Sequence, residues 1–125
     1  MTTTSKKDTA AAFLTMCASG SVREAYTRYV RENFKHHNPQ CPCDRHSLME
    51  AMEKSALEDP NKSFQIRKVI ECTDSVAVLS RLQPSKVDLG YAVVHILKFE
   101  GGKIAEMWEV VQEIPEESPN ELGMF

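Results

Sequence analysis

The apolar residues of this chain change their spacing near Lys62, and this change restricts the fold more than any other feature of the sequence. Before Lys62 they recur every three or four residues, as on one face of a helix. After it they alternate with polar residues, as in strands. Helices followed by a run of antiparallel strands are typical of the α+β class, with the helices on one face of a curved sheet. The length of 125 residues fits one domain, so we expect a single α+β domain over residues 1–125.

Start and stop signals divide the first half of the chain into three helices. Gly20 is placed as a residue that ends a helix in the left-handed conformation. Ser21 and Glu24 have the spacing of a capping box, and either Asp44 or Ser47 can begin the last helix. We expect helices between Asp8 and Gly20, between Ser21 and Asn38, and between Asp44 and Pro60. All three would then precede the first strand.

The last predicted hairpin contains Gly101-Gly102, and its loop length decides which side chains share a face of the sheet. A two-residue loop would pair His95 with Trp108 and direct Glu109 to the opposite face. A three-residue loop that begins at Glu100 and ends in a left-handed glycine brings His95 and Glu109 to one face, on a diagonal. We therefore predict the three-residue loop. One face then holds Val93, His95, Leu97, Met107, Glu109 and Val111, and the other holds Val94, Ile96, Ile104, Trp108 and Val110.

Both faces of this hairpin are apolar, so both have to be covered. The helices can cover only one of them. A second copy of the chain is the simplest cover for the other. The sequence therefore predicts a homodimer through the outer sheet face, with Trp108 in the interface.

Charge and hydropathy exclude several classes of function. Lys and Arg number 15 and Asp and Glu number 18, a net charge of −3 that leaves no basic surplus for nucleic acid or an anionic membrane surface. No apolar run approaches the roughly 20 residues of a membrane span, and the first residues lack the pattern of a secretion signal. We therefore expect a cytoplasmic protein without nucleic-acid or membrane partners, whose four cysteines stay reduced.

Three segments resemble one protein family. Residues 29–39, which end in His37-Asn38-Pro39, are similar to a helix that runs into a glutamine-histidine-asparagine-proline turn. Residues 93–112, VVHILKFEGGKIAEMWEVVQ, resemble a strand pair with a glycine-lysine-isoleucine turn and a glutamate-histidine-tryptophan-aspartate segment. Residues 120–125, NELGMF, resemble an asparagine-rich end in Met-Phe. The chain thus resembles the SnoaL-like polyketide cyclases of the nuclear transport factor 2-like superfamily, which also contains ketosteroid isomerase.

The resemblance implies a cone, in which a strongly bent antiparallel sheet wraps around helices and encloses a pocket. It also implies aldol-type ring closure or a related proton transfer on an apolar carbonyl compound, with no cofactor and no metal. The acid/base aspartate of the cyclases corresponds to Glu109, which is one methylene longer. Three further positions depart from the family pattern: Met107 replaces a histidine, His95 a frequent aspartate and His36 a glutamine.

A carboxylate beside an imidazole in an apolar cavity suits the removal of a proton next to a carbonyl. The base has to work near the ambient pH, and a donor has to hold the enolate oxygen. We assign Glu109 as the base and His95 as its partner or as the electrophilic donor. The structural alternatives are an ordinary carboxylate and a hydrogen-bonded core histidine.

Further residues can complete the pocket. His37 can act at its mouth as a second proton carrier oriented by Asn38, unless Asn38 only ends the helix. Tyr26 and Tyr29 lie on the helical stripe that faces the sheet, and we expect one of them to be core and the other to offer a hydroxyl to a ligand. The other predicted substrate-binding residues are Met107, Val93, Leu97 and Val111.

Two alternatives stay open. Five potential zinc ligands lie between His36 and His46, but their spacing is not that of a zinc ribbon or a paired-histidine helix, so we expect no metal. The same pocket could also serve a non-catalytic carrier or sensor of small molecules, because this fold hosts binding modules as well as enzymes. A protein-binding adaptor would instead have a filled pocket.

Overall fold

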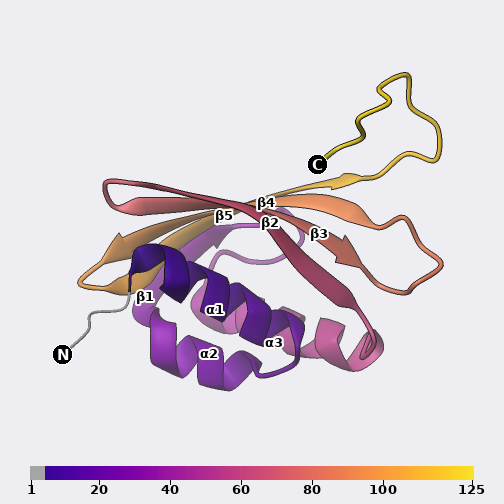
Figure 1. The fold of residues 1–125 in the computed structure, drawn as a ribbon. Coiled ribbons are helices and arrows are strands. Elements are labelled where there is room, and N and C mark those ends of the chain that lie inside the picture. The colour runs from indigo at the N-terminus through magenta and orange to yellow at the C-terminus, as the bar shows by residue number, and fades with distance from the viewer. Residues whose placement is uncertain (1–4) are drawn as a thin grey trace.

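The structure is a computed structural model that describes residues 5–125, so residues 1–4 of the predicted domain lie outside it. Its elements are α1 (Lys6–Ala18), α2 (Val22–Tyr29), β1 (Val30–His37), α3 (Arg45–Glu58), β2 (Ser63–Cys72), β3 (Ser75–Gln83), β4 (Tyr91–Glu100) and β5 (Lys103–Glu113). The strands form one five-stranded sheet in the order β1-β5-β4-β3-β2. The sheet curves over the three helices, which all lie on one face (Figure 1). The expected α+β architecture is confirmed.

The first helix agrees with the prediction except at its start. Ser5, rather than Asp8, is the N-cap, and its hydroxyl accepts a hydrogen bond from the Asp8 N–H at 3.1 Å. At the other end Gly20 adopts a left-handed φ of +99°. This lets the Ser21 N–H donate to the Met16 carbonyl at 2.9 Å, which closes the helix end.

The predicted second helix is wrong beyond Tyr29. α2 ends there and residues 30–37 form β1, so one strand precedes α3. Val30 and Phe34 misled the sequence analysis because residues four apart share a face in a strand as well as in a helix. Parallel pairing with β5 gives the backbone N–H and C=O groups of this segment their hydrogen-bond partners, so the segment forms a strand. In the described structure the Ser21 side chain makes no cap hydrogen bond, so the predicted capping box is wrong too.

The third helix begins at one of its two predicted caps. The Asp44 carboxylate accepts hydrogen bonds from the N–H and the hydroxyl of Ser47, at 2.9 and 2.7 Å. The helix ends at Glu58, just before Pro60, as expected.

The β4–β5 hairpin closes in two residues, so the predicted three-residue loop is wrong. Glu100 pairs with Lys103 across Gly101-Gly102, whose φ values of +60° and +81° fit a type I′ turn. The register then shifts immediately beyond the turn, where Ala105 forms a β-bulge. The bulge adds Ala105 to β5, whereas the predicted loop took Glu100 out of the pairing with β5.

This bulge restores the side-chain pattern that a plain two-residue loop would have reversed. His95 now pairs directly with Glu109 rather than with Met107, and Met107 pairs with Leu97. The six residues predicted for the inner face share that face, as expected. Ile104 is the exception among the outer-face predictions, because it precedes the bulge and is fully buried on the inner side.

The core fills the space between the helices and the inner face of the sheet. Phe13 of α1 and Tyr26 of α2 are fully buried and meet edge to face with ring centroids 5.3 Å apart. The outer face keeps exposed apolar side chains, namely Ile70, Ile96 and Val110. Within residues 5–125, each helix is too short or too polar to cross a bilayer.

Candidate functional site

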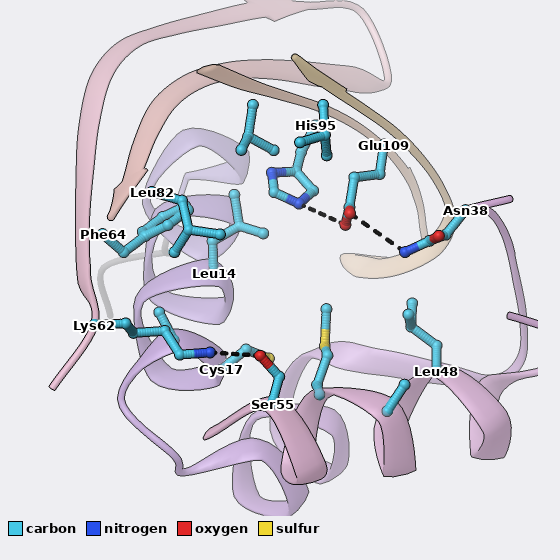
Figure 2. Close-up of a pocket in the computed structure, with 15 residues that line it drawn as sticks. Leu14, Cys17, Asn38, Leu48, Ser55, Lys62, Phe64, Leu82, His95 and Glu109 are labelled. Atoms are coloured by element: carbon cyan, nitrogen blue, oxygen red, sulfur yellow. Dashed lines mark hydrogen bonds and ion pairs between the residues drawn. The ribbon is translucent and has the colours of Figure 1, made fainter. Parts of the chain in front are cut away.

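A cavity of about 210 Å³ opens between the helices and the inner face of the sheet. Its walls come from α1, α3 and the strands β2 to β5, and most of the lining is apolar. Figure 2 shows the polar side chains in two groups, with His95, Glu109 and Asn38 in one and Lys62 and Ser55 in the other. The apolar side chains of Leu14, Phe64 and Leu82 lie between these groups.

His95 and Glu109 form the centre of the first group. The hairpin register places them opposite each other, and His95 Nε2 lies 3.1 Å from Glu109 Oε2. The His95 side chain is 6 % exposed and that of Glu109 is 20 % exposed, so the pair is largely withdrawn from water. An imidazole and a carboxylate in contact at an apolar wall are the arrangement that the sequence analysis expected.

Asn38 holds the other oxygen of Glu109. Its Oδ1 accepts a hydrogen bond from the Gln40 N–H at 2.8 Å, in the turn that follows β1. This contact fixes the amide orientation, so the NH₂ group faces Glu109 and Nδ2 donates to Oε1 at 3.3 Å. The amide carries a second N–H, and Asn38 lines the cavity.

The charge of Glu109 follows from these contacts. Burial raises the pKa of this carboxyl group, but the hydrogen bond and the charge of His95, with a contribution from His36, more than offset burial. The pKa of Glu109 therefore lies below its ordinary value, and the group is a carboxylate at neutral pH. Each oxygen has a further lone pair beyond the hydrogen bond that it accepts, so Glu109 can still take a proton.

The His95 ring contacts Glu109 through one nitrogen only. Its Nε2 faces the carboxylate, and its Nδ1 is buried without a hydrogen-bond partner in the described structure. Phe64 packs edge-on against the ring at 6.4 Å between centroids. The enclosed ring therefore holds its Nε2 against the carboxylate of Glu109.

The cavity brings together about half of the residues predicted for the site. Those that line it are Asn38, Val93, His95, Glu109 and Val111. Leu97 and Met107 share the inner face but lie in the core. Tyr26 is the core tyrosine, fully buried with its hydroxyl 3.3 Å from Met52 Sδ, while Tyr29 packs at the edge of the core. Neither tyrosine lines the cavity, contrary to the expectation for one of them.

His37 lies on the outer face, so its predicted place at the pocket mouth is wrong. It pairs with Trp108 across the β1–β5 ladder, and the two rings stack at 5.0 Å between centroids. Its Nε2 contacts Glu106 Oε2 at 2.7 Å. Adjacent residues of a strand point to opposite faces, so the neighbouring His36 is the histidine that points inward.

His36 supports the turn that carries Asn38. The Asn38 N–H donates to His36 Nδ1 at 3.2 Å. The His36 ring is buried and stacks on Phe34 with centroids 6.2 Å apart. Recognition of β1 as a strand would have identified this residue, because alternation then selects His36 rather than His37.

The helical and loop residues of the cavity were also missed by sequence reasoning. Cys17, Met52, Ser55 and Lys62 all line it. Burial raises the pKa of the Cys17 thiol to about 12, which keeps it protonated at neutral pH. The helical stripes give a signal for Cys17 and Met52, whereas Lys62 follows a proline turn and has no sequence signal of its own.

A metal centre is not assembled from the tract between His36 and His46. Among residues 5–125, no three His, Cys, Asp or Glu side chains gather closely enough to hold an ion. His36 and His37 point to opposite faces of the sheet, which separates two of the candidate ligands. All four cysteines, each within the described range, are free.

Sequence comparison identifies one family. The sequence model of the SnoaL-like domain matches residues 10–107, most of the chain, and ends two residues before Glu109. A comparison with curated proteins finds no match.

Several solved structures share the fold of this chain. A nuclear transport factor 2-like protein of unknown function from Cytophaga hutchinsonii is 18% identical, with a TM-score of 0.72 over 89% of this chain and 93% of that one. A Bacillus cereus protein that carries the provisional name polyketide cyclase is 23% identical, with a TM-score of 0.72 over 84% and 72% of the two chains. A provisionally named isomerase of the SnoaL-like family from Agrobacterium tumefaciens is 12% identical, with a TM-score of 0.71 over 85% and 97%. The predicted cone fold is confirmed.

Proposed function

This chain belongs to the SnoaL-like domain family, and we propose that it is an enzyme that moves a proton next to a carbonyl group of a small apolar compound. The reaction class is aldol-type ring closure or isomerisation without a cofactor. The observation that carries the proposal is the contact between Glu109 and His95, 3.1 Å apart at the wall of an apolar cavity.

In this proposal Glu109 is the base. It takes the proton from the carbon beside the carbonyl, and His95 and Asn38 keep its two oxygens in place. The second N–H of Asn38 offers a hydrogen bond to the developing enolate oxygen. A ligand that excludes water from the cavity would also raise the pKa of Glu109 toward a value that favours proton transfer.

The first test measures proton abstraction directly. We expect the protein to accelerate the exchange of α-protons for deuterium in an apolar ketone such as 2-tetralone, followed by proton NMR in D₂O. Glu109→Gln should reduce this acceleration by about 10²-fold or more, because general-base catalysis contributes roughly that much. Glu113→Gln, which replaces the exposed glutamate at the end of β5, is the matched control and should exchange at the wild-type rate.

A second candidate function is binding without turnover. It is favoured by one observation: both oxygens of Glu109 already accept hydrogen bonds within the protein, and the pKa of the group is lowered. Ketones that bind to the wild type but exchange no faster than in buffer would support this carrier function and contradict the enzyme.

We also propose that the protein is a homodimer and that it is cytoplasmic. Exposed apolar residues on the outer sheet face support a homodimer. The four free cysteines suit the reducing cytoplasm.

A further inference from the structure

A second polar site lies in the cavity away from Glu109. Lys62 Nζ donates a hydrogen bond to Ser55 Oγ at 2.7 Å, and both residues line the cavity (Figure 2). Ser55 belongs to the last turn of α3, and Lys62 follows the proline turn that ends this helix. The Lys62 N–H donates to the Asp59 carbonyl at 3.2 Å, which fixes the start of the side chain.

The Lys62 ammonium has unused donors. It carries three N–H groups, and Ser55 accepts one of them. Within the described residues no carboxylate reaches ion-pair distance of Nζ, although Asp59 and Glu58 add negative charge nearby. Partial burial removes some of the water around the ammonium and so lowers the pKa of Lys62. An anionic group in the cavity would compensate for this loss of hydration.

The two ends of the cavity differ in charge. Glu109 is a carboxylate at neutral pH and repels a second carboxylate, whereas Lys62 attracts one. The apolar walls between them accommodate a hydrocarbon body. A volume of about 210 Å³ is below the roughly 300–1,000 Å³ of pockets for drug-sized ligands, so the body is small.

We propose that Lys62, held by Ser55, binds a carboxylate of the ligand, so that the cavity takes a small apolar acid whose carbonyl end faces Glu109. The assignment of the carbonyl end rests on the proposed function. The assignment of the carboxylate end rests on the geometry of Lys62 and requires no turnover.

The experiment compares a charged probe with a neutral one of nearly the same shape. Calorimetric titrations of the full chain use 2-naphthoate and 2-naphthamide. We expect the wild type to bind the carboxylate about tenfold more tightly than the amide, a factor that corresponds to about 1.4 kcal/mol. Lys62→Met keeps most of the apolar stem and should abolish this preference while leaving amide affinity within about twofold. Lys62→Arg keeps the charge and should retain a preference for the carboxylate.

Several results would overturn the inference. They are an undiminished carboxylate preference in Lys62→Met, a wild type that prefers the amide, and a wild type that binds neither probe. Circular dichroism and the melting temperature check that each variant folds. If Lys62→Met does not fold, the Lys62→Gln variant replaces it in the same titrations, with the same expected loss.

The outcome separates this inference from the proposed function. Glu109→Gln should lose proton exchange and still prefer the carboxylate, because Lys62 is unchanged. Loss of exchange in Glu109→Gln without any effect of Lys62→Met on probe selectivity would refute only the carboxylate site. A Lys62-dependent preference in a protein that accelerates no exchange would refute only the enzyme.

Discussion

Glu109 is largely buried and makes two side-chain hydrogen bonds, and its protonation state depends on the balance between burial and these contacts. His95 and Asn38 each hold one of its oxygens, and the Asn38 amide is itself fixed by the Gln40 N–H. Such a chain of hydrogen bonds places the carboxylate before a ligand arrives, which reduces the entropy lost in the reactive complex. The contacts also favour the charged form of Glu109, so the group links stability to pH.

This linkage predicts an acid-dependent loss of stability. The folded-state pKa of Glu109 lies below the ordinary glutamate value of about 4.3. The ionised group therefore stabilises the fold at neutral pH, and this contribution is lost as the pH falls through the folded-state pKa. The difference in the free energy of unfolding between wild type and Glu109→Gln should be largest near pH 7 and should shrink below pH 4. Urea unfolding over this pH range measures it.

A matched control separates this effect from general acid destabilisation. Glu117 is exposed in the C-terminal tail, so Glu117→Gln should follow the wild type at every pH. A Glu109→Gln variant whose deficit stays constant from pH 7 to pH 3 would contradict the linkage.

At the level of elements, the β4–β5 hairpin decides whether the site exists. The type I′ turn at Gly101-Gly102 and the bulge at Ala105 act together, and each alone would reverse the faces of β5 relative to β4. With both present, His95 and Glu109 meet on the inner face. The site therefore depends on a bulge four residues before Glu109 and on a turn that begins six residues after His95.

The turn gives a prediction at this scale. Gly102 has a φ of +81° and open space where a Cβ would be, so Gly102→Ala tests backbone strain without a clash. A left-handed alanine should cost about 1 kcal/mol of unfolding free energy, and Gly102→Asn should cost less because asparagine tolerates this conformation better. Thermal and urea unfolding measure both variants. Equal stability of Gly102→Ala and wild type would argue against the two-residue turn.

For the whole molecule, the sheet has one face covered by helices and one that carries exposed apolar side chains. Val110 is 65% exposed and Ile96 is 39% exposed on this outer face, close to Trp108. We expect two copies to pack these faces together, so the protein in solution should have the mass of a dimer.

Light scattering coupled to size exclusion measures that mass. Val110→Lys should shift the protein to a monomer, because a charge in an apolar interface is costly to bury. Glu113→Lys lies on the same strand outside the apolar patch and should leave the dimer intact. A monomeric wild type at micromolar concentration would refute the dimer.

Local patterns determined much of this protein. Period-two alternation identified β2 to β5, and Gly20 and Asp44 marked helix ends correctly, because these signals depend on neighbours a few residues apart. Given that Glu109 and His95 share a face of the hairpin, the alternation of residues also predicted which apolar side chains lie beside them. The family motifs predicted the cone fold and the position of the Glu109 carboxylate.

Only the tertiary structure decided the remainder. Residues 30–37 form a strand because β5, from the other end of the chain, supplies their hydrogen-bond partners. In this strand His36, rather than the predicted His37, points to the inner face. The spacing of the glycines fitted a loop of two residues or of three. It therefore could not predict that a two-residue turn is combined with a bulge. Lys62 reached the cavity through the turn after α3, where its side chain bonds to Ser55, and an irregular turn leaves no periodic signal in the sequence.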